Sequence, residues 1–275
     1  MSLVHRPWEE TADFAIGLKP IALERWLEGG EADPAARKDA LFATARDLVW
    51  AETEGSRPGQ SEVLAMVEAA AGAAEPRPDL PPLLAAARRV ADDLCLMEKR
   101  DDQWRLTALS LCAGTFFTAS EVAGLSLAEL HGPVHGFSGR FLKRVERIFE
   151  GLRPGLVLER RNWTVVNATE LHTPHAAPIR ARIGGIDPRD AGLAVQIRTE
   201  RQTLRRLPAT GGAVFTIRVR LDPLAALSEH PERLAAFAAA WRAATPEFRA
   251  YKRFDLYDGL VEAFLAQARA AAPAE

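Results

Sequence analysis

The clearest candidates for chemistry are charged side chains on a stretch that otherwise has the pattern of a β-strand. The stretch RTERQTLRRLPATGGAVFTIRVRLDPL, residues 198–224, contains six arginines and one glutamate, although the chain carries a net charge of only −2. If a strand runs through it without a bulge, Arg201 lies on the apolar face and Arg198 and Glu200 lie on the other. An unpaired guanidinium on an apolar face is costly, so Arg201 requires a ligand's anionic group or an internal carboxylate.

Glu200 has two readings. A single bulge reverses the two faces and turns Glu200 toward the apolar side instead. A carboxylate in that place can attract a cationic ligand and can deliver protons during a reaction. In the alternative, Glu200 pairs with Arg198, Arg201 or Arg218 and only braces the sheet.

The chain has six histidines, and four of them form two closely spaced pairs. The pairs are His131 with His135 in LAELHGPVHGF, and His172 with His175 in ELHTPHAAP. Spacings of four and three are typical of metal-ligand pairs on helices, but each pair encloses a proline, which disfavours a helix. A loop histidine is therefore the simpler interpretation for most of them. His131 differs, because the adjacent Gly132-Pro133 turn can hold its imidazole in the fixed direction that an axial metal ligand needs.

Several familiar cofactor motifs are missing from the sequence. It contains no GxGxxG after a strand, no GxxxxGK[ST] and no CxxCH for covalent haem. Two cysteines, Cys95 and Cys112, cannot supply the four thiolates of an iron–sulfur cluster, and we expect both to be buried free thiols. Redox chemistry by this chain would therefore take its electrons from another chain. The near-neutral charge also argues against a general polyanion-binding protein.

The elements that position these residues indicate an α+β fold with a mainly antiparallel sheet. Helices are expected over 35–52, after Pro58 and, as a longer helix, through 83–97; a basic helix is expected over 140–150, and two helices close the chain. Strands are expected over 104–111, 163–169, 193–199 and 213–221. We expect a single domain, 1–275, whose first hundred residues are mainly helical. No run approaches the roughly 20 apolar residues of a membrane span, so a soluble cytoplasmic protein is expected.

Five stretches resemble one known family, the haem-dependent oxidative N-demethylases, long catalogued as a domain of unknown function. They are LCLM (94–97), LHGPVHGF (130–137), RNW (161–163), the arginine-rich stretch 198–224 and YKRFDLYDGLVEAFL (251–265). The most specific piece is ERQTLRRLP followed by a strand. The sequence departs from the family's usual pattern over AGTFFTASEVAG, 113–124, where Phe117 stands at the position of an expected tryptophan.

The resemblance implies a PAS-like fold around haem b and oxidation of an N-methyl group of a small secondary amine, such as dimethylamine, by O₂. The products are the demethylated amine and formaldehyde, and a separate flavin and iron–sulfur reductase subunit supplies the electrons. His131 is then the expected axial ligand of the iron, with His172 in reserve. Arg198 and Arg201 are the expected partners of the haem propionates, and Glu200 is expected to contact the amine or a proton relay.

Two other classes of function stay open from the sequence. One is a non-catalytic PAS-like protein that senses haem or another small ligand, since fold does not fix function. The other is a non-haem metalloenzyme that uses the histidine pairs.

Overall fold

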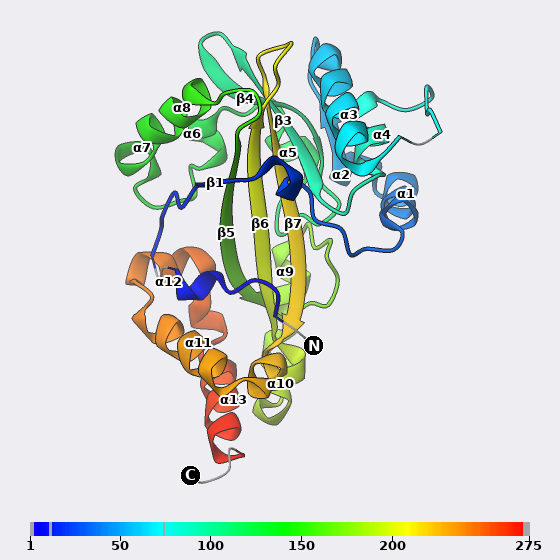
Figure 1. Ribbon diagram of the computed structural model, residues 1–275. Helices are drawn as coiled ribbons and strands as arrows, with labels where there is room; N and C mark the ends of the chain where they lie inside the picture. Colours follow the sequence, from blue (N-terminus) through cyan, green and yellow to red (C-terminus); the bar gives the residue numbers. More distant parts are fainter. Residues whose placement is uncertain (1–2, 11–12, 74, 272–275) are drawn as a thin grey trace. The chain divides into compact units, whose positions relative to one another are not determined.

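A computed structural model describes residues 3–10, 13–73 and 75–271 of the chain (Figure 1). Its strands form one sheet in the order β1-β5-β6-β7-β3-β4-β2. The pairings of β1 with β5, β2 with β4, and β3 with both β4 and β7 are antiparallel. The strand bounds are Lys19–Ile21 (β1), Trp50–Glu52 (β2), Asp93–Arg100 (β3), Gln103–Ser110 (β4), Val157–Val166 (β5), Gln196–Arg206 (β6) and Ala213–Pro223 (β7).

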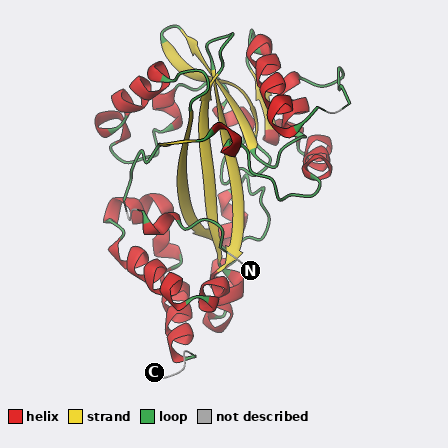
Figure 2. Cartoon of the chain, viewed as in Figure 1, coloured by secondary structure: helices red, strands yellow, loops and turns green. Residues whose placement is uncertain are grey.

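Helices make up most of the remaining regular structure, and Figure 2 distinguishes them from the strands. Their bounds are Pro34–Thr44 (α1), Arg46–Val49 (α2), Arg57–Ala71 (α3), Pro82–Ala87 (α4), Ala119–Val122 (α5), Leu127–Leu130 (α6), Phe137–Arg140 (α7), Leu142–Gly151 (α8), Ala176–Ala181 (α9), Ala191–Ala194 (α10), Pro231–Ala243 (α11), Pro246–Lys252 (α12) and Asp258–Ala270 (α13). The predicted α+β class, with an antiparallel sheet flanked by helices, is confirmed.

The chain forms two compact units. Unit 1 contains Met1–Ala15, Arg161–Glu200 and Val219–Glu275, and unit 2 contains Ile16–Arg160 and Arg201–Arg218. The divisions fall within β5, β6 and β7. Each unit has apolar cores of its own. The prediction of one domain over the whole length stays a prediction.

The core of unit 1 is rich in aromatic side chains. Trp163 on β5 packs edge-on against Phe237 of α11, with ring centroids 5.6 Å apart. Trp241 stacks on Phe254 at 4.2 Å. Phe237 and Phe254 are fully buried, and Trp241 is nearly so. Aromatic pairs at these distances add to the free energy gained by burial alone, so this core holds β5 and the C-terminal helices together.

The helix predicted through 83–97 is wrong beyond Ala87. Only α4 is helical there, and the LCLM run lies in β3. Leu94 and Leu96 are fully buried, and Cys95 and Met97 are nearly so, because β3 is an inner strand between β4 and β7. A strand buried on both faces has no alternation of apolar and polar residues, so its pattern cannot be told from that of a buried helix.

Other predicted bounds were shifted rather than wrong in type. The strand predicted over 163–169 is the second half of β5, and the strand predicted from Leu193 begins at Gln196, after the short helix α10. The alternating strand predicted over 213–221 is β7. Within 35–52 the structure has two helices and the short strand β2.

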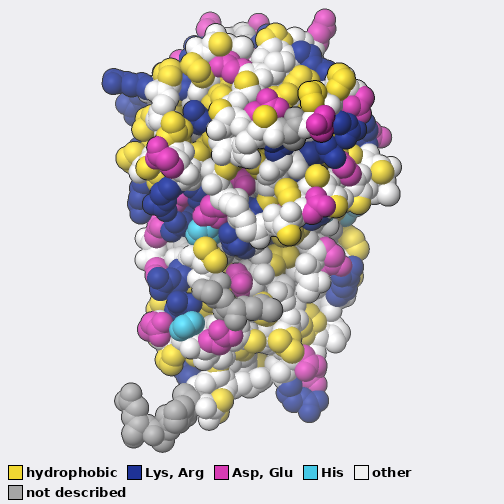
Figure 3. Space-filling view, turned by 45° about the vertical axis from the view of Figure 1, so that its right-hand side comes forward, with side chains coloured by type: hydrophobic (Ala, Val, Ile, Leu, Met, Phe, Trp, Pro, Cys, Tyr) yellow, Lys and Arg dark blue, Asp and Glu magenta, His cyan; other side chains and the backbone are white. Residues whose placement is uncertain are grey.

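The surface carries charges of both signs. Figure 3 shows lysine and arginine side chains interspersed with aspartate and glutamate over the visible face. In the part of the chain that the structure describes, no helix has both the length and the apolar character needed to cross a bilayer.

Candidate functional site

A cluster of polar side chains in unit 1 contains Glu200. Arg198 and Glu200 are two residues apart on β6 and lie on the same side of the strand, as alternation requires. The Arg198 Nε lies 3.4 Å from Oε1 of Glu200, and the Asn162 Nδ2 donates to Oε2 of Glu200 at 3.3 Å. Lys252, the last residue of α12, donates from Nζ to the Asn162 Oδ1 at 3.0 Å.

Burial differs along this cluster. Arg198 is buried, with 3% of its surface exposed, whereas the Glu200 side chain keeps 21% exposure. The sequence left open whether Glu200 pairs with an arginine, and the structure pairs it with Arg198. A carboxylate accepts up to about four hydrogen bonds, so this pairing is compatible with a further contact to an ammonium group.

Arg201, the next residue along β6, belongs to unit 2 and has a different environment. Its side chain is 1% exposed, and its Nε donates to Oε2 of Glu159 at 2.6 Å and lies 3.2 Å from Oε1 of Glu28. Its Nη1 donates to the Trp26 carbonyl at 2.9 Å, and its Nη2 donates to the Arg25 carbonyl. Internal carboxylates therefore neutralise Arg201, which was one of the two outcomes expected from the sequence. Its contacts tie residues 25–28 to the sheet.

His131, in unit 2, follows directly after α6. The capping box of Ser126 and Glu129 starts this short helix, and the Nδ1 of His131 bonds with the Leu127 carbonyl at 2.9 Å. The imidazole stacks on Phe137, with centroids 4.2 Å apart and an interplanar angle of 7°. Burial lowers the pKa of His131, which favours the neutral ring. With its hydrogen on Nδ1, the ring presents the lone pair of Nε2, the arrangement that a metal-ligating histidine needs.

His172, in unit 1, also fits a ligand role on one observation. Both of its ring nitrogens are buried, and neither has a hydrogen-bond partner among the described residues. Burial, with a smaller contribution from His175, lowers the pKa of His172.

The two histidine pairs do not lie on helices. His135 and His175 are exposed, α6 ends before His131 and α9 begins after His175. The prediction that the enclosed prolines break these helices is confirmed. Within residues 3–10, 13–73 and 75–271, no group of three or more histidine, cysteine, aspartate or glutamate side chains is placed to hold a metal ion.

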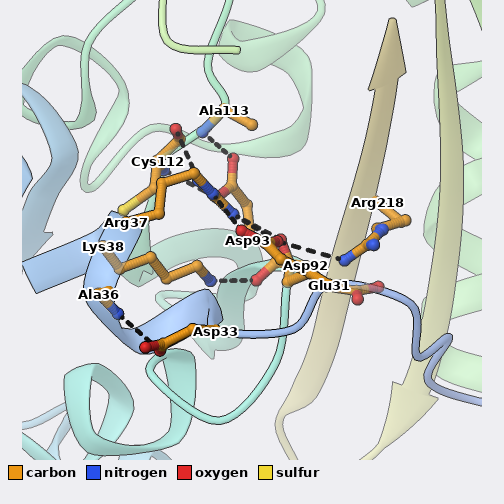
Figure 4. A network of polar contacts seen from close by, with 11 residues as sticks. Glu31, Asp33, Ala36, Arg37, Lys38, Asp92, Asp93, Cys112, Ala113 and Arg218 are labelled. Carbon is orange, nitrogen blue, oxygen red and sulfur yellow. Dashed lines mark hydrogen bonds and ion pairs between the residues drawn. The ribbon is translucent and has the colours of Figure 1, made fainter.

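A buried ionic network in unit 2 was not found from the sequence (Figure 4). Lys38 and Asp92 are fully buried, and Asp93 is 1% exposed. The Nζ of Lys38 donates to the backbone carbonyl of Asp92 at 2.6 Å. Asp93 accepts hydrogen bonds from the backbone N–H groups of Cys112 and Ala113 at 2.7 and 2.9 Å. These contacts fasten β3 both to α1 and to the start of the divergent segment 113–124.

The same network also contains ion pairs to Glu31 and a carboxylate that has no hydrogen-bond partner among the described residues. Arg37 donates two hydrogen bonds to the Glu31 carboxylate, from Nε at 2.7 Å and from Nη2 at 3.1 Å. The Nη1 of Arg218 lies 3.7 Å from Oε2 of Glu31. Neither carboxylate oxygen of Asp92 has a hydrogen-bond partner among the described residues. Burial raises the pKa of Asp92 to about 6, and nearby Arg218 and Lys38 oppose that rise. Burial lowers the pKa of Lys38.

Few features of the sequence pointed to this network. Asp92-Asp93 stands directly before the apolar LCLM run, where two adjacent acids next to a buried strand are unusual. Lys38 sits in the middle of α1, a position that is normally solvated, so nothing marked it as buried.

One family model matches the chain, and its description is haem-dependent oxidative N-demethylase, alpha subunit-like. The match covers residues 59–261 of the 275. His131, His172, Arg198, Glu200 and Arg201 all lie within it. None of the curated proteins matches the chain.

Proposed function

The chain belongs to the haem-dependent oxidative N-demethylase, alpha subunit-like family, and from this membership we propose that it removes an N-methyl group from a small secondary amine. Dimethylamine is the proposed type of substrate. The reaction consumes O₂, electrons and protons, and it releases the demethylated amine, formaldehyde and water. The observation that carries this proposal is the match to the family over most of the chain.

The proposed cofactor is haem b, with His131 as the axial ligand. Its support is the Nδ1 contact to the Leu127 carbonyl, which leaves Nε2 to bind a metal. The stacked Phe137 adds a second restraint on the ring. His172 is the reserve ligand, because both of its nitrogens lack a partner among the described residues. When bound, haem supplies the activation of O₂. The PAS-like character of the fold is part of the same proposal.

Arg198 is the preferred partner for a haem propionate. Each guanidinium nitrogen of Arg201 is already held by an internal carboxylate or carbonyl, so Arg201 is the second choice. The Arg198 Nε lies 3.4 Å from the carboxylate of the partly exposed Glu200. If a propionate takes Arg198, this ion pair is lost and Glu200 can contact another cation.

Glu200 is then the proposed contact for the substrate. Simple dialkylamines are cations at neutral pH, so an ionised carboxylate attracts them and holds the nitrogen in place. The same carboxyl can pass protons to the reacting centre. In the proposed complex, the haem propionate pairs with Arg198 and the substrate ammonium pairs with Glu200. Each charge of the original Arg198–Glu200 pair then still has a partner of opposite charge.

The proposed electron source is a separate reductase subunit that carries flavin and iron–sulfur centres. Its support is the family description, which denotes an alpha subunit. The cytoplasm is the proposed location, because the two cysteines are buried free thiols, as is common in a reducing compartment.

The visible absorption spectrum of the purified, haem-reconstituted chain tests the proposal. A Soret band that shifts on addition of dimethylamine is expected, and His131→Ala should change the ligand signature while His172→Ala leaves it unchanged. A Soret band without any response to amines would favour a sensor. No Soret band but tightly bound zinc or iron would favour a non-haem metal protein. An unchanged ligand signature in His131→Ala would reject the axial assignment.

A further inference from the structure

Asn162 bridges two charged side chains of unit 1. Its amide oxygen accepts from Lys252 at 3.0 Å, and its amide nitrogen donates to Glu200 at 3.3 Å. We infer that Lys252 and Asn162 are positioning residues which fix the direction of the Glu200 carboxylate and keep it ionised for the amine. This inference rests on the proposed role of Glu200.

The chemistry of the two partners fixes the orientation of the Asn162 amide. An ammonium group only donates hydrogen bonds, and an ionised carboxylate only accepts them. Lys252 therefore requires the oxygen of Asn162 on its side, and Glu200 requires the nitrogen on the other. The reversed amide would place N–H groups against the ammonium and an oxygen against the carboxylate, so both contacts would be repulsive.

The local structure holds Lys252 in place for this contact. α12 begins at a Thr245 cap, whose hydroxyl accepts from the Phe248 N–H at 3.3 Å, and Lys252 is the last residue of the helix. The ammonium lies 5.3 Å from the ring centroid of Tyr251 and 5.5 Å from that of Phe248. A cation is favoured both over aromatic faces and at a helix C-terminus.

The bridge carries the effect of the Lys252 charge to Glu200. A cation at the amide oxygen polarises the amide and strengthens its N–H as a donor, because neighbouring hydrogen bonds reinforce one another. Glu200 contacts Arg198 at Oε1 and accepts from Asn162 at Oε2. When a propionate takes Arg198, as proposed above, the Asn162 bond still fixes the direction of the Glu200 carboxylate.

Three variants and one control test the inference, and each variant is expected to act differently from a change that only disturbs the fold. Lys252→Met removes the charge, and Lys252→Arg restores it on a longer side chain. Asn162→Asp keeps an acceptor for Lys252 but puts a second carboxylate against Glu200. Arg242→Met is the matched control, because it removes an exposed cation of the same unit that pairs with Glu262.

The first readout is independent of the amine and of turnover. The carboxylate infrared band of Glu200, assigned by the difference from Glu200→Gln, is followed as the pH falls in the full haem-loaded chain. The pH at which the band is lost should move upward in Lys252→Met and further upward in Asn162→Asp. It should stay at the wild-type value in Arg242→Met and return toward it in Lys252→Arg. An unmoved band in both Lys252→Met and Asn162→Asp would overturn the inference.

The second readout is the dissociation constant for dimethylamine, measured by titration of the same proteins. It should rise about threefold in Lys252→Met and about tenfold or more in Asn162→Asp, in line with loss of a hydrogen bond to a charged group. If the infrared band moves but amine affinity does not, the positioning role holds and the proposed contact between Glu200 and the amine fails. Thermal unfolding of each variant identifies any protein that has simply lost its fold, and Lys252→Gln then replaces Lys252→Met.

Discussion

The polar cluster of unit 1 and the ionic contacts of unit 2 use the same residue types in different ways. In unit 2, Arg201, Lys38 and Asp93 are almost fully buried, and each binds backbone groups as well as any charged partner. In unit 1, Glu200 keeps partial exposure and contacts the side chains of Arg198 and Asn162. Backbone groups are fixed by the fold, whereas side chains can rotate. Buried charges bonded to backbone thus brace a fold, and charges bonded to side chains can change partners when a ligand arrives.

The largest effect on stability should come from Arg201. Replacement by methionine removes the ion pair with Glu159, which is 8% exposed, and the hydrogen bonds to two backbone carbonyls. Removing one partner of a buried pair costs about 3–5 kcal/mol of unfolding free energy. Urea unfolding should show that loss for Arg201→Met and a clearly smaller one for Arg198→Met. Equal losses at the two arginines would break the comparison.

A pH-dependent effect should come from Asp92, and the size of its pKa shift limits this effect to about 3 kcal/mol. Its pKa is raised from an ordinary value near 3.8 to about 6, so the folded chain binds a proton there more tightly than the unfolded chain does. The carboxyl therefore favours folding at low pH, and this advantage is lost as the pH rises from about 4 to about 6. Asp92→Asn should gain stability relative to wild type between pH 4 and pH 8, measured by urea unfolding. A difference between the two proteins that is independent of pH would contradict the raised pKa.

A smaller effect, about 1–2 kcal/mol, should come from a neutral pair that joins β6, the strand of Arg201, to β7. The Thr203 hydroxyl bonds to that of Thr216 at 2.7 Å, and both residues are fully buried. Thr203→Val leaves the other hydroxyl buried without its partner, so it should destabilise the chain. The double variant Thr203→Val/Thr216→Val should recover part of the loss in the same unfolding experiment. Additive losses would show that the two hydroxyls act independently.

The smallest effect on stability should come from Glu200. A partly exposed ion pair contributes about 0–1 kcal/mol, so Glu200→Gln should unfold almost as the wild type does. Its affinity for dimethylamine should fall, because the glutamine has no charge to attract the ammonium. A large loss of stability with unchanged amine affinity would show that Glu200 stabilises the fold, as Arg201 does, and does not bind the amine.

Features that depend on residues close together in the sequence could be predicted from it. The alternation of apolar and polar residues predicted strand β7. Arg198 and Glu200 are two residues apart and so share one side of a strand, which made their ion pair one of the expected arrangements. β3 was missed because its apolar run, Leu94 to Met97, is buried on both faces and so carries no period-2 signal.

Contacts between distant residues could not be predicted from one sequence. Asn162 and Lys252 are 90 residues apart, and Lys38 lies 54 residues from Asp92. Residue types alone indicate that a buried charge needs a partner, but the fold decides which residue supplies it. Arg201 is another example, because its carboxylate partners are Glu159 and Glu28, which are also distant in sequence.

Formaldehyde release tests the central claim most directly. The haem-reconstituted chain, supplied with dimethylamine, O₂ and a chemical or enzymatic reductant, should form formaldehyde and methylamine in equal amounts, and Glu200→Gln should form far less under the same conditions. Reduced, haem-loaded protein that binds the amine but yields no formaldehyde would contradict the proposed demethylation.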